Sequence, residues 1–204
     1  GLLAEKTGAA QDAYNAASRA AAALLARWNE SSGRRDASLA GAVASLLGAT
    51  AEAPDAGCDA TRPDDPALAP LRAVAADDAA LSARLEHFLA ESTRLVPWAS
   101  RALASGDLAT FGALADRSQE LAGTLLGNQV PQTAALAADA RELGAHAASA
   151  FGAGFGGSVW ALVDAAGASD FAGEWLGRYR ACYPELDGAC VLVTRPGAAA
   201  ERLP

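Results

Sequence analysis

Hydrophobic residues recur at helical spacing over residues 1–145. This pattern predicts helices over 5–29 and 37–48, then a loop over the proline-rich and acidic stretch 50–70. Three helices are expected after this loop. Asp77 or Asp78 caps the first, a long helix that Pro97 kinks or divides. Asp107 caps the second, and the third runs from Pro131 to Gly144.

After Gly144 the pattern changes to short apolar runs of strand length, at 147–151, 158–163 and 189–194. Between the last two runs, bulky residues share one helical face: Phe171, Trp175, Leu176 and Tyr179. The order is therefore β-loop-β-α-β. We expect an α+β fold in which a small antiparallel sheet, ferredoxin-like in its β-α-β portion, packs against several helices. A single domain is expected over 1–204, helical to about 145 and β-containing over 146–196.

The composition excludes several classes of partner. With 24 acidic and 16 basic residues the net charge is -8, which opposes binding to nucleic acid or to an anionic membrane. The three cysteines, Cys58, Cys182 and Cys190, are odd in number and lack metal-ligand spacing, so we interpret them as reduced thiols. No apolar run has the length of a membrane span and no signal peptide is evident, so a cytoplasmic location is expected.

The stretch "FGAGFGGSVWALV", residues 151–163, has four glycines within six positions. Glycine reaches positive φ at low cost, and successive exposed N–H groups form a concavity that binds anions. The alternative is a tight turn between two strands with no ligand. The letters fit the G-x-G-x-x-G-x-V loop of protein kinases, but the V-A-I-K, H-R-D and D-F-G motifs are absent from the sequence. A dinucleotide fingerprint would have to open a helix, and a Walker A loop would need G-K-[ST].

The same glycine stretch resembles the third conserved motif of the GHMP small-molecule kinases, and Phe155 between the glycines is similar to the galactokinase branch. Three further stretches resemble that branch in order and spacing: "EHFLAESTRLVPWASRALASGDLATFGALADRSQ" at 86–119, "LLGNQVPQTAALAADARELGAHAASAFGAGFGG", and "EKTGAAQDAYNAASRA" with its Tyr-Asn pair. The resemblance covers most of the chain, except the loop between residues 50 and 75. It corresponds to the C-terminal half of such an enzyme.

The resemblance implies an ATP- and Mg²⁺-dependent sugar 1-kinase that phosphorylates the C1 hydroxyl of galactose or a related sugar. The loop on the phosphate side of the cleft would be Gly152, Ala153, Gly154, Phe155, Gly156, Gly157 and Ser158. Tyr14 would contact the sugar. The Ser-rich ATP loop and the catalytic aspartate of the family are not in this sequence, so no catalytic residue is expected here and an N-terminal kinase half, in cis or in trans, is the expected partner. Alone, the chain is expected to be inactive.

Two departures leave the sugar open. The Tyr-Asn pair continues as "AASR" without the usual pair of arginines, and Ser118-Gln119 replaces the Ser-His of galactokinases. The alternative function is a non-catalytic sugar- or nucleotide-binding or regulatory module with the same fold. A helical interaction domain whose sheet is only structural is a third reading. His87 and His146 show no acid–base pattern, and we interpret Trp160 and Trp175 as core residues.

Overall fold

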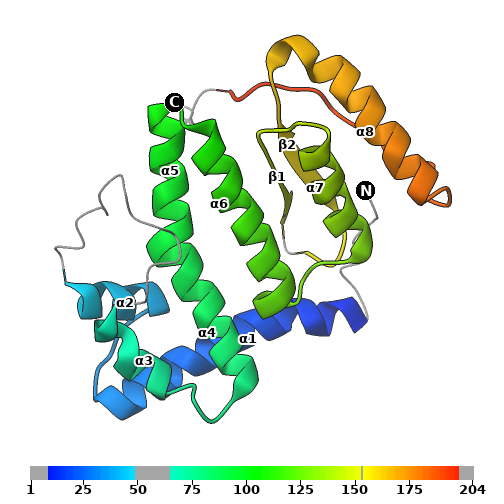
Figure 1. Cartoon of the computed structure of the whole chain (residues 1–204). Helices are drawn as coiled ribbons and strands as arrows, with labels where there is room; N and C mark the ends of the chain where they lie inside the picture. The colour runs from blue at the N-terminus through cyan, green and yellow to red at the C-terminus, as the bar shows by residue number, and fades with distance from the viewer. Residues whose placement is uncertain (1–8, 49–64, 153, 198–204) are drawn as a thin grey trace, which may run out of the picture.

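A computed structural model describes residues 9–48, 65–152 and 154–197. The described residues form mostly helices, together with a small β-hairpin (Figure 1). The helices before the hairpin are α1 (Ala9–Ser32), α2 (Leu39–Leu47), α3 (Ala69–Ala73), α4 (Ala79–Ala90), α5 (Val96–Ser105), α6 (Leu108–Leu121) and α7 (Pro131–Glu142). The hairpin strands β1 (Ala147–Phe151) and β2 (Ser158–Leu162) follow, and then α8 (Ala168–Cys182). This is the α+β class that the sequence predicts.

Several helix boundaries are confirmed. The Asp78 carboxylate accepts hydrogen bonds from the N–H groups of Ala80 and Leu81 at the start of α4. Gly106 ends α5 in the left-handed conformation, and the Asp107 carboxylate accepts from Thr110 N at the start of α6. Asp77 instead pairs with Arg27 of α1. In the expected loop, Asp65 caps a short 3₁₀ turn, η1 (Pro66–Leu68), ahead of α3, while residues 49–64 lie outside the described ranges.

Pro97 divides its helix without breaking it. A π-helical turn, η2 (Glu91–Leu95), joins α4 to α5, and Pro97 lies in the first turn of α5. A proline ring inside a regular α-helix would clash with the carbonyl four residues earlier, and the wider π turn re-spaces those carbonyls. A second π turn, η3 (Ala122–Leu126), extends α6 and ends at Gly127 in the left-handed conformation.

The two strands are antiparallel, with Ala147 opposite Leu162 and Phe151 opposite Ser158. The third strand expected over 189–194 is not formed, so that prediction was wrong. The Arg180 side chain donates a hydrogen bond to the carbonyl oxygen of Ala189. Within this apolar run, Ala189 is buried and Val191 packs on the core, whereas Leu192 and Val193 are exposed. Only some residues of the run therefore contribute to the core.

Three apolar clusters hold the elements together. The first joins α1, α2, α3 and α4 through residues such as Leu24, Trp28 and Leu71. The second packs α7 and α8 with the hairpin, and it includes Trp175, as expected for a core residue. Trp160 is only half-buried and its ring lies 6.1 Å from that of Phe111. The third cluster lies between the helix pair α4–α5 and α6.

Helix α6 approaches β1 unusually closely. A Cβ atom at Gly112 would lie 2.0 Å from the carbonyl oxygen of His146. Arg141 of α7 donates to the carbonyl oxygens of Ala145 and His146 and pairs with Asp116 of α6. Together, these contacts fix α6 and α7 against the start of β1. In the part of the chain that the structure describes, no helix has the length and hydropathy needed to cross a membrane.

Candidate functional site

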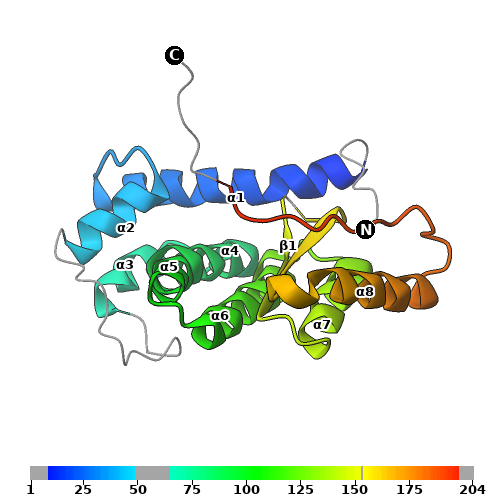
Figure 2. The ribbon, with the colours of Figure 1, turned by 90° about the horizontal axis from the view of Figure 1, so that it is seen from above.

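The glycine loop, residues 152–157, joins β1 to β2 and lies at the end of the hairpin that points toward α1 (Figures 1 and 2). Its φ angles are 87° at Gly152, 83° at Gly154, 59° at Phe155, 119° at Gly156 and 92° at Gly157. A residue with a Cβ atom pays roughly 1–2 kcal/mol in the left-handed region, which explains why glycine fills four of these five positions. Ala153 lies outside the described residues.

One side of the loop is anchored. The Phe155 N–H donates to the carbonyl oxygen of Asn128 at 2.6 Å. A Cβ atom at Gly154 would lie 2.2 Å from the same oxygen and 2.7 Å from the Asn128 side chain. The lack of a side chain at Gly154 therefore makes room for the protein's own Asn128. Asn128 is 8% exposed and belongs to the segment between η3 and α7.

The other side of the loop is open. A Cβ atom at Gly152 or at Gly157 would meet no heavy atom within 4 Å. Both residues have positive φ, which favours glycine. No neighbouring atom would exclude a side chain at either position. Such an open stretch of glycine backbone is a surface that an anion can approach, because backbone N–H groups in such turns bind anions.

Amide side chains hold the anchored side in place. Gln119 of α6 accepts hydrogen bonds from the Ala150 N–H and the Ser149 hydroxyl of β1, both at 2.9 Å. Its own amide nitrogen donates to Gln129 Oε1 at 3.0 Å, and Gln129 in turn donates to Asn128 Oδ1 at 3.1 Å. The chain Gln119–Gln129–Asn128 thus connects the strand before the loop to the residue that anchors it.

The sequence carries a signal for this network. Gln119 departs from the Ser-His pair of galactokinases, and "NQ" at 128–129 belongs to the longer stretch that resembles that branch. Thr133, which is 1% exposed, donates to Gln129 Oε1 at 3.2 Å. A polar N-Q-x-P-x-T run just before a helix is the pattern that could have indicated buried amide contacts.

The remaining candidate residues are spread over the fold. Tyr14 lies within α1, and its side chain is not among the described ones. Ser158 begins β2 and is exposed. Ser118 donates to the Glu91 carboxylate at 2.6 Å, on the side of α6 toward η2.

The contacts of both histidines are with residues outside the glycine loop. His146 precedes β1, at the opposite end of that strand from the loop, and its Nε2 lies 3.2 Å from the exposed Asp164 carboxylate. His87 is half-buried in α4, where burial lowers the pKa of its imidazole and Arg84 lies 3.5 Å from Nδ1. These surroundings fit a packing role for His87 and a surface contact for His146.

Among the described residues, no group of three or more His, Cys, Asp and Glu side chains is placed to hold a metal ion. Cys182 and Cys190 are exposed free thiols, and Cys58 lies outside the described ranges.

Part of the chain is similar to a known protein family. Residues 99–181 match the model of the family described as GHMP kinases C terminal. The matched segment begins in α5 and ends in α8, so it contains the hairpin, the glycine loop and both residues of the Asn128–Gln129 pair. No curated protein matches the chain. This segment is thus similar to the C-terminal module of an ATP-dependent phosphotransferase family.

Proposed function

We propose that residues 1–204 form the C-terminal domain of a GHMP-type small-molecule kinase, with ATP as phosphoryl donor and a sugar as acceptor. The observation that carries the proposal is the glycine loop, which lies inside the matched segment and is anchored on one side and open on the other. In phosphoryl transfer the protein supplies positioning and charge stabilisation, so a rigidly held loop of backbone N–H groups is a suitable contribution.

Each residue of the proposed site has a distinct part. Gly152 and Gly157 present open backbone toward the phosphates, while Gly154 and Phe155 fix the loop to Asn128. Tyr14 lies on α1, the helix toward which the loop end of the hairpin points, and we propose that it contacts the sugar (Figure 2). Galactose is the reference substrate by resemblance, and the departures near Tyr14 and Gln119 leave arabinose and galacturonate open.

The chemistry also needs a Ser-rich ATP loop and a carboxylate that aids deprotonation of the sugar hydroxyl. We propose that an N-terminal kinase domain supplies both, in cis or in trans, together with the Mg²⁺ ligands. A cytoplasmic location fits this proposal, because ATP is available there.

Nucleotide contact can be tested on the chain itself. In an amide-resolved NMR titration with ADP, we expect the N–H signals of Gly152 and Gly157 to shift. The amides of α8, such as that of Gly177, serve as the internal control. Shifts spread evenly over the protein, or none in the loop at millimolar ADP, would contradict a phosphate-facing role.

Catalysis is tested by complementation. The chain mixed with ATP, Mg²⁺ and galactose should give no sugar phosphate above background, and addition of an N-terminal GHMP domain that carries the Ser-rich loop should produce kinase activity. In that complex, Gly157→Val should lower kcat/KM at least about 100-fold, about 2.7 kcal/mol on the barrier. Nucleotide binding without activity in any such complex would favour the non-catalytic module instead.

A further inference from the structure

The hydrogen bonds of the amide network Gln119–Gln129–Asn128 run in one direction. The Ala150 N–H can only donate, so the group that it meets on Gln119 is the amide oxygen, Oε1, at 2.9 Å. The Ser149 hydroxyl donates to the same oxygen, also at 2.9 Å. The amide nitrogen of Gln119 is therefore left to donate to Gln129 Oε1, at 3.0 Å. Strand β1 thus fixes which way the Gln119 amide faces.

The same direction continues to the residue that anchors the loop. Gln129 Oε1 also accepts a hydrogen bond from the hydroxyl of Thr133, a side chain that is 1% exposed, at 3.2 Å. Because its oxygen already accepts two hydrogen bonds, Gln129 donates through its amide nitrogen to Asn128 Oδ1, at 3.1 Å. The backbone carbonyl oxygen of Asn128 in turn accepts from the Phe155 N–H of the loop. Each member of the network is thus oriented by the one before it.

The position of the loop depends on Asn128. Among the described loop residues, Phe155 is the one that forms a hydrogen bond with a separate segment. Its φ of 59° is unfavourable for an aromatic residue, so this conformation needs a contact that holds it. Gly154 also lies against Asn128, because a Cβ atom there would be 2.7 Å from the Asn128 side chain. A displacement of Asn128 would therefore displace the loop.

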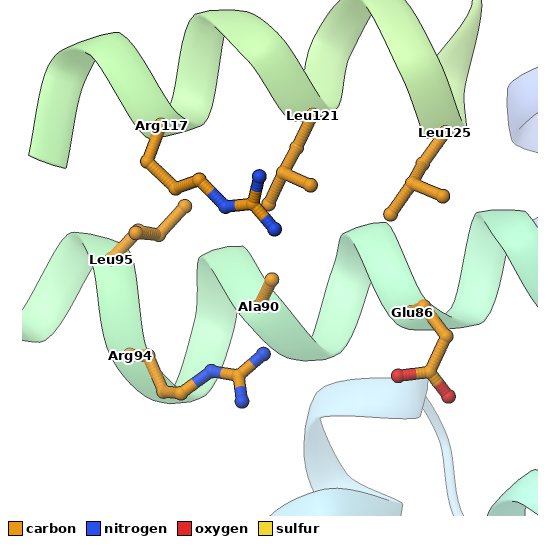
Figure 3. A pocket seen from close by; sticks show the side chains of 7 residues that line it. All are labelled: Glu86, Ala90, Arg94, Leu95, Arg117, Leu121 and Leu125. Atoms are coloured by element: carbon orange, nitrogen blue, oxygen red, sulfur yellow. The ribbon is translucent and has the colours of Figure 1, made fainter. Parts of the chain in front are cut away.

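Gln119 itself belongs to a helix that is packed on both sides. Residues two positions apart on a helix face different directions, and Arg117 and Leu121 point toward the facing helix, where they line a pocket of about 210 Å³ (Figure 3). Toward β1, the lack of a side chain at Gly112 lets α6 lie against the carbonyl oxygen of His146. The network therefore starts from a helix whose own position is fixed.

We propose that Gln119 and Gln129 are positioning residues, which hold the glycine loop in the conformation that binds the phosphates of a nucleotide. This inference rests on the phosphate-facing role proposed above for Gly152 and Gly157. The two glutamines do not touch the ligand, and they act through Asn128. Position matters here, because a displacement of about 1 Å at a site of this kind can lower the rate on the order of 100-fold.

Glutamate substitutions test the direction of the network. Gln129→Glu and Gln119→Glu keep oxygens that accept hydrogen bonds but lose the N–H that donates to the next member. In each variant, we expect ADP to bind the whole chain about 10-fold more weakly in an NMR titration. The Phe155 amide should also exchange with solvent about 10-fold faster, without any nucleotide present. Gln129→Met removes the same donor without adding charge, so it should weaken ADP binding to a similar extent.

Two controls separate positioning from charge and from stability. Gln132→Glu adds the same negative charge in the first turn of α7, where the Gln132 side chain forms no hydrogen bond with any described residue, and it should leave ADP binding unchanged. Ser149→Ala removes one hydrogen bond at the start of the network but leaves the Ala150 N–H on Gln119. It should therefore lower the melting temperature without weakening ADP binding. A purely structural glutamine would behave as Ser149 does.

The results distinguish this proposal from the one on which it rests. If the parent chain does not bind ADP at millimolar concentration, the phosphate-facing role of the loop is wrong, and the positioning role is wrong with it. If the parent binds ADP and folded Gln129→Glu and Gln129→Met bind it equally well, the positioning role alone is wrong. Unchanged exchange of the Phe155 amide in these variants would also overturn it. Thermal melts establish that each variant is folded, and Gln119→Glu interrupts the network at a second position if a Gln129 variant does not fold.

Discussion

The Phe155 N–H donates to the Asn128 carbonyl oxygen at 2.6 Å, and this bond joins the glycine loop to the segment that leads into α7. Phe155 itself has φ 59°, so an aromatic residue is held in the left-handed region by that contact. The loop is therefore fixed by the protein before any ligand arrives.

Gly154→Ala should destabilise the protein more than Gly157→Ala. Both glycines have positive φ, so both variants lose about 1–2 kcal/mol from backbone strain. Only at Gly154 would the new Cβ atom also overlap Asn128, at 2.2 Å from its oxygen, whereas Gly157 has open space. Urea unfolding of the two variants measures the difference. Equal losses would mean that the Asn128 contact adds no constraint beyond φ.

Gly112→Ala should destabilise, although alanine is favoured over glycine inside helices by about 1 kcal/mol. The methyl group would lie 2.0 Å from the His146 carbonyl oxygen and would push α6 away from β1. The matched control is Gly177→Ala in α8, where nothing lies within 4 Å, and we expect it to stabilise the protein. Thermal melts of both variants give the two signs, and stabilisation at Gly112 would contradict the close contact.

Gln119→Leu should lower the free energy of unfolding by about 1–3 kcal/mol, because two donors of β1 lose their acceptor. Ser149→Ala removes one of those donors. In a double-mutant cycle we therefore expect the two changes to be coupled rather than additive. Strict additivity would show that the Ser149–Gln119 hydrogen bond does not form in solution.

The carboxylate of Asp36 should make stability depend on acid pH. Hydrogen bonds from Arg34 and from the Trp28 indole lower its pKa to about 2, below the ordinary 3.8. A lowered pKa in the folded state stabilises the fold above the unfolded pKa, and this contribution is lost as the pH falls toward 2. The melting temperature of Asp36→Asn should be below that of the parent at pH 6, with the gap closing between about pH 4 and 2. Asp187→Asn, at an exposed position, is the control, and a gap that stays constant with pH would refute the role of Asp36.

The helical part was largely predictable because its boundaries are local. Asp78, Gly106, Asp107 and Pro131 each act through their own backbone neighbours, so their pattern alone indicates where a helix begins or ends. Both hairpin strands followed from short apolar runs, and β2 ends at Leu162, one residue before the predicted end.

The site was less predictable because it depends on contacts between distant segments. The loop glycines were identified, but nothing local to Gly154 indicates that Asn128 fills the space beside it. The strand predicted over 189–194 failed for the same reason, since an apolar run does not reveal whether a partner strand is present. A strand at this position would have needed the carbonyl oxygen of Ala189 for pairing. Here the side chain of Arg180, from α8, donates a hydrogen bond to that oxygen.

The hydrogen bond from Ala150 to Gln119 also bears on self-association. A strand at the edge of a small sheet offers unpaired backbone groups to other molecules, and this is a common route to aggregation. Here the side chain of a neighbouring helix occupies the Ala150 N–H, as a backbone carbonyl of another strand would. By accepting this hydrogen bond, Gln119 opposes the pairing of a strand from another copy of the chain at this edge.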